Sequence, residues 1–238
     1  MPVLKAAGGA EIHYDVEGDG PLVLLVHGGT GTGAYDWEFQ RAPLARRYRV
    51  VTPDLRGHGR SSDPQWLLSV EQIGEDIVAL IEELGRRPAA IVAFSIGATA
   101  ILRLLCRRPD LTSAFVVVGA SPKGHPERVP GIVNGPWPRA LRELRHEHGD
   151  GPEHWKALRR RLAESWSGAH DLTAEDVAAI EIPTLVVCGD RDVIEPVETG
   201  LWLMRHVPNG ELLVLPGAGH FVMRDRPREF TVAVEEFL

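Results

Sequence analysis

Short apolar runs alternate with longer amphipathic stretches along most of this chain, and this alternation constrains its fold more than any other feature. Each run is a few residues long and almost continuously apolar, which is typical of strands covered on both faces in a parallel sheet. The runs predicted as strands are Leu22–Val26, Arg49–Thr52, Ala90–Ala93, Phe115–Gly119, Thr184–Cys188 and Leu212–Leu215.

The stretches between these runs have apolar residues at helical spacing. In the clearest of them, Ser69 is a predicted N-cap with Gln72 three residues later, and Gly85 ends the pattern. Helices that alternate with parallel strands predict a doubly wound α/β fold with right-handed crossovers. The other helices predicted in this part of the chain are Ala98–Arg107, Glu198–His206 and Glu229–Phe237.

The N-terminal segment follows a different pattern. Val3–Lys5 and Glu11–Val16 flank the pair Gly8-Gly9, and the second run begins with alternating polar and apolar residues. This pattern predicts an antiparallel hairpin at one edge of the otherwise mostly parallel sheet.

The stretch from about Pro122 to Glu181 contains no convincing strand. Pro-rich turns are followed by helical patterns over Pro138–His148 and Glu153–Trp166. A chain of 238 residues is long enough for one α/β core with a single insertion. We therefore predict a core made of residues 1–121 and 181–238, with a short helical cap insertion at 122–180.

Charge and hydropathy exclude several classes of protein. The formal net charge is −7, which argues against a non-specific nucleic-acid binder. No apolar run approaches the roughly 20 residues of a membrane span, and the first residues do not resemble a secretory signal. Cys106 and Cys188 lie in apolar segments without metal-ligand spacing, which favours two buried free thiols. We expect a cytoplasmic protein with a small-molecule substrate, no nucleic-acid or membrane partner, and an oligomeric state that the sequence leaves open.

The strongest chemical signal is the segment Ile91–Ala98, in which a buried strand ends, Ser95 follows, and a helix begins at once. Small residues, Ala93 and Gly97, lie two positions before and after Ser95, as a sharp strand-to-helix turn requires. Such a turn strains the serine backbone and exposes its hydroxyl above the sheet. An ordinary serine at a helix start is the alternative interpretation.

This segment resembles the nucleophile elbow of the α/β-hydrolase superfamily, G-x-S-x-G, with Ala93 in place of the first glycine. His27-Gly28-Gly29-Thr30, after the first parallel strand, is similar to the oxyanion loop of that family. The resemblance implies that the backbone amides of Gly29 and Ile96 form the oxyanion hole. His27 is interpreted as a residue that braces the loop.

The acid and base follow in the order of the family. Gly189-Asp190-Arg191-Asp192 comes after a strand and resembles the family pattern G-x-x-D, which assigns the acid to Asp192. Asp190, interpreted as a turn cap, and Glu195 are its nearby competitors. His220 follows a Gly-rich loop after the last strand, where the family has its base. The segment Pro53–Ser61 is similar to the D-x-R-G-x-G-x-S loop of the family, in which Asp54 and Arg56 are interpreted as bracing residues.

The resemblance implies a serine hydrolase, most simply a carboxylesterase acting on small to medium acyl groups without a metal or organic cofactor. Lactonases, meta-cleavage C–C bond hydrolases and proline iminopeptidases use the same triad, and a small-molecule receptor of this fold is a non-enzyme alternative. His146, His148 and His154 do not have the spacing of a metal site and are interpreted as a solvated helix end. Trp137, Trp155 and Trp166 are placed either in a pocket or in the insertion's own core. The predicted pocket residues are Thr30, Phe94, Trp137 and Phe221.

Overall fold

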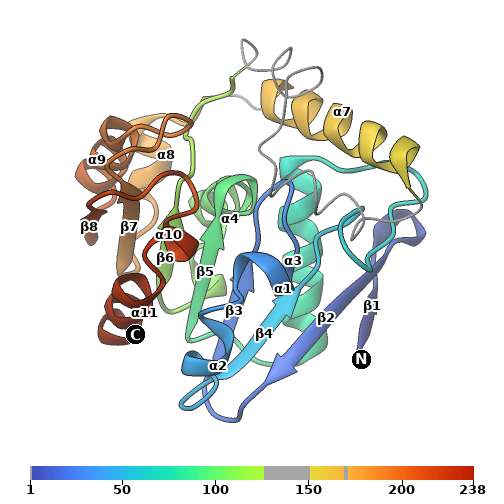
Figure 1. The fold of residues 1–238 in the computed structure, drawn as a ribbon, viewed down its shortest axis with the longest axis horizontal. Coiled ribbons are helices and arrows are strands. Elements are labelled where there is room, and N and C mark those ends of the chain that lie inside the picture. The colour runs from blue at the N-terminus through green and yellow to red at the C-terminus, as the bar shows by residue number, and fades with distance from the viewer. Residues whose placement is uncertain (1, 126–150, 169–170) are drawn as a thin grey trace.

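The computed structural model describes residues 2–125, 151–168 and 171–238, and these form an eight-stranded, mostly parallel sheet with helices on both faces (Figure 1). The strand order is β1-β2-β4-β3-β5-β6-β7-β8. The first pairings, β1 with β2 and β2 with β4, are antiparallel, and the remaining pairings are parallel. The strands are β1 (Val3–Lys5), β2 (Glu11–Glu17), β3 (Leu22–Val26), β4 (Arg49–Pro53), β5 (Ala90–Phe94), β6 (Phe115–Val118), β7 (Thr184–Gly189) and β8 (Gly210–Leu215). This confirms the predicted doubly wound sheet and its N-terminal hairpin.

Successive side chains of a strand point to opposite faces of the sheet. In the central strands both faces are buried, each in its own apolar cluster. In β3, Leu24 and Val26 belong to one apolar cluster, whereas Val23 and Leu25 belong to the other. The first cluster includes side chains of α3 (Val70–Leu84), α4 (Ser95–Arg107) and α9 (Val197–His206). The second includes side chains of α2 (Arg41–Leu44) and α11 (Pro227–Phe237).

Strand β8 differs from the prediction of strands covered on both faces. It pairs only with β7 and forms the edge of the sheet, so most of its residues are partly or fully exposed; Val214 is 37% exposed. The continuous apolar run in the sequence therefore does not distinguish this edge strand from a central one.

The helix after Ser69 begins and ends as predicted. The Ser69 hydroxyl accepts a hydrogen bond from the Gln72 backbone N–H at 3.0 Å, and Gly85 ends the helix in the left-handed conformation. The helix after β5 starts at Ser95 rather than at Ala98, which places Ser95 directly at the junction of strand and helix.

Between β6 and β7, the described residues contain two helices, α7 (Pro152–Gly168) and α8 (Ala174–Ala178). Helix α7 includes the predicted helix Glu153–Trp166, whereas the predicted helix Pro138–His148 lies outside the described residues. The remaining short elements are η1 (Ala7–Gly9), α1 (Gly33–Asp36), η2 (Pro109–Leu111) and α10 (Val222–Asp225).

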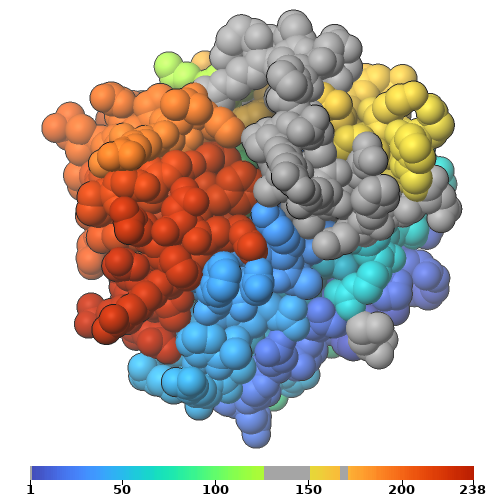
Figure 2. Space-filling model, in the orientation of Figure 1, coloured from blue at the N-terminus to red at the C-terminus, as the bar shows by residue number. Residues whose placement is uncertain are grey.

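The two ends of the chain contribute to the same face of the molecule. In Figure 2, C-terminal residues coloured orange and red lie beside N-terminal residues coloured blue. Residues that are distant in sequence are therefore neighbours on this face. Within the described part of the chain, no helix has the length and apolar character needed to cross a membrane. The described residues include no group of three or more His, Cys, Asp or Glu side chains that could hold a metal ion.

Candidate active site

Ser95 occupies the sharp turn between β5 and α4 in a backbone conformation that serine rarely adopts. Its φ is 52°, in the left-handed region, and the residue is half-buried. Gly97 has to be small because a Cβ atom at this position would overlap the carbonyl oxygen of His27. The atoms nearest to that Cβ position belong to Val26 and His27, where β3 ends, and not to Ala93, the other small residue of the turn.

Three side chains from separate strand ends form a hydrogen-bonded chain. The Ser95 Oγ lies 3.0 Å from His220 Nε2, and His220 Nδ1 lies 2.7 Å from Asp192 Oδ2. The other oxygen, Asp192 Oδ1, accepts hydrogen bonds from the backbone N–H groups of Ile194 and Glu195 at 2.8 and 2.9 Å. The structure therefore brings together the predicted nucleophile, base and acid.

The charge of Asp192 sets the proton positions along this chain. Burial raises the pKa of Asp192, but the hydrogen bond and charge of His220 and the two backbone N–H groups outweigh burial, so the pKa lies below its ordinary value. An ionised carboxylate only accepts hydrogen bonds. His220 Nδ1–H therefore donates to Asp192, and Nε2 is the ring nitrogen that faces the Ser95 hydroxyl.

The two competing carboxylates of this loop have other partners. Asp190 is exposed, and its Oδ1 accepts the backbone N–H of Gly217 at 2.6 Å, so it caps the turn that leads to His220, as the sequence analysis proposed for it. Glu195 is buried, with Oε1 3.7 Å from His125 Nε2.

Two residues that the sequence analysis did not connect with the base hold the His220 ring. Gly119 has a φ of 56°, and a Cβ atom there would lie 2.9 Å from His220 Cε1. The Phe94 ring also lies close to it, with its centroid 4.9 Å from that of the imidazole. The glycine at the end of the predicted strand Phe115–Gly119 was the available signal, but the need for it depends on His220, which lies about a hundred residues later in the chain.

The loop after β3 is held by His27, which is fully buried. The Leu55 N–H donates to His27 Nε2 at 2.8 Å, so Nδ1 carries the proton and donates to the Gly28 carbonyl at 2.6 Å. Burial keeps the pKa of His27 well below its usual value, so the ring stays neutral. The bracing role predicted for His27 is confirmed.

Asp36 also holds the loop after β3. Its Oδ2 accepts the Gly28 N–H at 2.8 Å, and a Cβ atom on Gly31 would overlap its carboxylate. Burial raises the pKa of Asp36 to about 7, against the smaller opposing effects of Gly28 and of the Arg224 charge.

This pKa predicts a pH-dependent stability that Asp36→Asn removes. Because the pKa is higher in the folded state, folding is favoured at low pH, and that contribution is lost as pH rises from about 4 to about 7. It amounts to at most about 4 kcal/mol, since one pKa unit corresponds to about 1.4 kcal/mol. In urea unfolding, the stability of Asp36→Asn relative to wild type should rise between pH 5 and pH 8. An unchanged difference would show that Asp36 does not titrate in this range.

The loop after β4 is braced as predicted, although Asp54 and Arg56 do not pair with each other. Asp54 accepts the Gly33 N–H at 3.0 Å and pairs with Arg60 at 2.8 Å. The fully buried guanidinium of Arg56 pairs with Asp63 and Asp76 at 3.1 and 2.6 Å.

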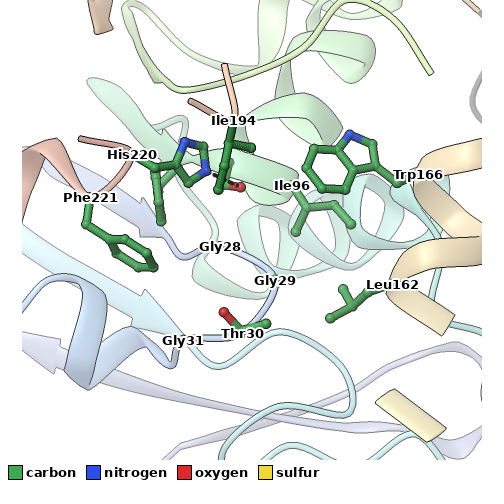
Figure 3. Close-up of a pocket in the computed structure, with 12 residues that line it drawn as sticks. Gly28, Gly29, Thr30, Gly31, Ile96, Leu162, Trp166, Ile194, His220 and Phe221 are labelled. Carbon is green, nitrogen blue, oxygen red and sulfur yellow. Dashed lines mark hydrogen bonds between the residues drawn. The ribbon is translucent and has the colours of Figure 1, made fainter. Parts of the chain in front are cut away.

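A small, mainly apolar cavity of about 80 Å³ lies beside Ser95 (Figure 3). Leu162 and Trp166, both from α7, lie on one side of it, and His220 and Phe221 lie on the other. The predicted pocket residues Thr30, Phe94 and Phe221 line the cavity, whereas Trp137 lies outside the described residues. The full lining is Gly28, Gly29, Thr30, Gly31, Phe94, Ser95, Ile96, Leu162, Trp166, Ile194, His220 and Phe221.

Leu162 and Ile194 also line the cavity but were not among the predicted pocket residues. Trp166 was placed either in a pocket or in the core, and it lines the cavity, whereas Trp155 is buried in the core. Helical spacing identifies the buried face of α7 but does not show what that face covers.

His154 was interpreted as part of a solvated helix end. Instead, its Nε2 lies 2.8 Å from the Gly57 carbonyl, and its ring lies 5.0 Å from that of Trp66. This histidine therefore attaches α7 to the loop after β4. His146 and His148 lie outside the described residues.

Comparisons with known proteins place the chain in a family. The model of the alpha/beta hydrolase family matches residues 23–234, so the chain belongs to that family and is a hydrolase. Its sequence is 29% identical to the putative carbamate hydrolase RutD of a Caulobacter species, over 96% of this chain and 94% of that protein. It is 28% identical to a non-heme haloperoxidase of Rhodococcus erythropolis, over 92% of this chain and 93% of that protein. The enol-lactonase of Burkholderia xenovorans has the same fold, with a TM-score of 0.85, 24% identity and 99% coverage of both chains.

Proposed function

We propose that this protein is a serine hydrolase that cleaves carboxylic esters of small to medium acyl groups. The observation that carries the proposal is the hydrogen-bonded chain of Ser95, His220 and Asp192, which ends at the apolar cavity. A serine hydroxyl is a weak nucleophile unless an adjacent base takes its proton, and this geometry provides that base.

In the first half of the reaction, Ser95 Oγ attacks the ester carbonyl carbon while His220 Nε2 takes the hydroxyl proton. Asp192 stabilises the imidazolium that forms. The tetrahedral intermediate collapses, the bond to the alkoxy oxygen breaks, and His220 returns the proton to the leaving alcohol. An acyl group is then bonded to Ser95.

In the second half, a water molecule attacks the acyl carbon and His220 takes its proton. The bond to Ser95 Oγ breaks, the carboxylic acid leaves, and His220 returns the proton to Ser95. The sum of the steps is ester plus water to acid plus alcohol. The two half-reactions require no group beyond the residues already named and water.

The backbone amides of Gly29 and Ile96 are the proposed oxyanion donors. Both residues line the cavity beside Ser95. Ile96 is the second residue of α4, where backbone N–H groups have no partner within the helix and the helix dipole favours negative charge. One donor of this kind typically contributes about 3 kcal/mol to stabilisation of the transition state.

The proposed substrate size rests on the cavity and on the helix that covers it. We propose that residues 122–180 form a cap on a core made of residues 1–121 and 181–238. Side chains of α7 lie so close to the oxyanion loop that a Cβ atom on Gly29 would be 3.1 Å from Leu162 Cδ2. A cavity of about 80 Å³ under this helix favours short acyl chains.

Hydrolysis of p-nitrophenyl esters with graded acyl length tests the proposal, with Ser95→Ala measured in parallel. We expect the wild type to hydrolyse short acyl esters fastest and the variant to be slower by about 10⁴-fold or more. Equal rates in both proteins would contradict the proposal.

A carbamate and a lactone belong in the same panel of substrates because the names of two similar proteins refer to these compound classes. A clear preference for either would change the substrate class while leaving the nucleophile in place.

Shortening Leu162 should change the acyl preference. Leu162→Ala removes the side chain that lies over Gly29, so we expect the best acyl chain to become longer by about two carbons and the rate on acetyl esters to fall severalfold. The matched control is Leu158→Ala, which truncates a fully buried leucine one turn earlier in α7 that is not part of the cavity lining. If both variants shift the preference equally, the effect comes from the stability of α7 rather than from the pocket.

A further inference from the structure

His58 is a buried histidine that the proposed reaction does not use, and its ring contacts two backbone carbonyl groups. Its Nε2 lies 2.9 Å from the oxygen of Gly29, and its Nδ1 lies 2.9 Å from the oxygen of Arg56. The Gly29 contact joins the loop after β4 to the loop after β3, whereas the Arg56 contact lies within a single turn. The residue is 0% exposed.

The two contacts compete for a proton. A carbonyl oxygen only accepts hydrogen bonds, and a neutral imidazole has a single N–H. Burial lowers the pKa of His58, whereas the two carbonyls and the carboxylate of Asp54 act in the opposite direction with a smaller total effect. At neutral pH, the ring therefore has one proton for two acceptors. His27, whose ring centroid is 5.2 Å away, is also neutral.

The turn around Arg56 is already closed by its own backbone. The His58 N–H donates to the Leu55 carbonyl at 2.9 Å, and the Ser61 N–H donates to the His58 carbonyl at 2.8 Å. In the free side chain of histidine, the tautomer protonated at Nε2 is the more populated one. Both facts favour a proton on Nε2, where it bridges the two loops.

The carbonyl that His58 holds belongs to the residue whose amide is a proposed oxyanion donor. The Gly29 N–H is in the same planar peptide group as the Gly28 carbonyl, which His27 holds. The Gly29 carbonyl belongs to the next peptide group, which His58 contacts. Fixing both peptide groups fixes the two backbone torsions of Gly29, a residue type that otherwise has the greatest conformational freedom.

We propose that His58 is a positioning residue for the oxyanion hole, in which Nε2–H donates to the Gly29 carbonyl and so holds the Gly29 amide toward the reacting carbonyl. This inference rests on the proposed function, because only an oxyanion formed beside Ser95 requires that orientation. A donor positioned before the reaction stabilises developing charge without the cost of reorganisation.

A pair of substitutions distinguishes this role from support of the local turn. The amide nitrogen of glutamine reaches about as far along the side chain as Nε2, and that of asparagine about as far as Nδ1. We expect His58→Gln to retain kcat within about threefold. The amide of His58→Asn can donate a hydrogen bond to the Arg56 carbonyl but does not reach the Gly29 carbonyl. We expect this variant to lose about 10-fold in kcat with little change in KM. That loss is smaller than the roughly 100-fold expected when an oxyanion donor is removed. If His58→Asn matches wild type, or if His58→Gln is the more impaired variant, the proposal is wrong.

Nitrogen NMR of the wild-type histidines tests which ring nitrogen of His58 carries the proton, and it does not require turnover. At neutral pH, we expect the His58 ring to be protonated at Nε2 and unprotonated at Nδ1, with its signals assigned by their loss in His58→Gln or by through-bond connection to the backbone. A proton on Nδ1 alone would overturn the proposal. This readout does not depend on ester cleavage, so the two proposals can fail separately. Activity that survives in Ser95→Ala would show that the proposed function is wrong, whereas a proton on Nδ1 would show that the His58 assignment is wrong.

Discussion

Replacing Ser95 with alanine is expected to lower kcat on the best ester by about 10⁴-fold or more. The variant keeps the Cβ atom and the left-handed backbone of the turn, so its fold and its ability to bind substrate should change little. It loses only the oxygen that lies 3.0 Å from His220 Nε2. Steady-state kinetics on purified protein, with unfolding curves for both proteins, measure the effect.

Ser62→Ala is the matched control for this substitution. Ser62 is exposed, and its hydroxyl accepts a hydrogen bond from the Glu11 backbone N–H at 3.0 Å, far from the strand-to-helix turn. Its removal should leave kcat within about twofold, because surface substitutions away from special features usually have small effects. Comparable losses in both variants would mean that Ser95 acts through the fold and not as the nucleophile.

Replacing Asp192 with asparagine should cost about 10³- to 10⁴-fold in kcat. Asp192 holds the His220 proton on Nδ1 and stabilises the imidazolium. An uncharged amide stabilises the imidazolium poorly, and it also permits the tautomer of His220 that is protonated at Nε2. KM should change much less than kcat, because the side chain does not line the substrate cavity.

Asp190→Asn separates this role from general loss of charge. Asp190 is two residues away in the same loop, but its carboxylate caps the turn at Gly217 and is exposed. We expect a loss of less than about 10-fold. A loss at Asp190 equal to that at Asp192 would show that the acid is misassigned.

The sequence was sufficient for the features that depend on local patterns. Alternating strands and helices predicted the sheet, and Ser69 and Gly85 predicted the ends of α3, because a cap and a left-handed terminus need particular residue types. The Ser95 turn was predicted for the same reason, since only small residues fit beside it. The proposed roles of Asp192 and His220 came from the resemblance to a family, and the structure adds the distances that connect them.

The features that depend on contacts between distant segments could not be read from the sequence. Nothing near Leu162 indicates that its helix face meets Gly29, and nothing near Gly119 indicates that it leaves room for His220. Strand β8 has the composition of a central strand but lies at the edge, because its position follows from the topology of the whole sheet. His58 lies within a recognised loop pattern, yet its contact with Gly29 joins two loops that only the folded sheet brings together.

The most direct test of the central claim is covalent capture of the nucleophile. A phosphonate that reacts with activated serine hydroxyls, followed by intact-mass measurement and peptide mapping, identifies the residue that attacks. We expect one adduct per chain, located on Ser95, and no adduct in Ser95→Ala or in protein unfolded before labelling. An adduct on another residue, or labelling of Ser95→Ala equal to that of the wild type, would contradict the assignment of Ser95 as the nucleophile of this hydrolase.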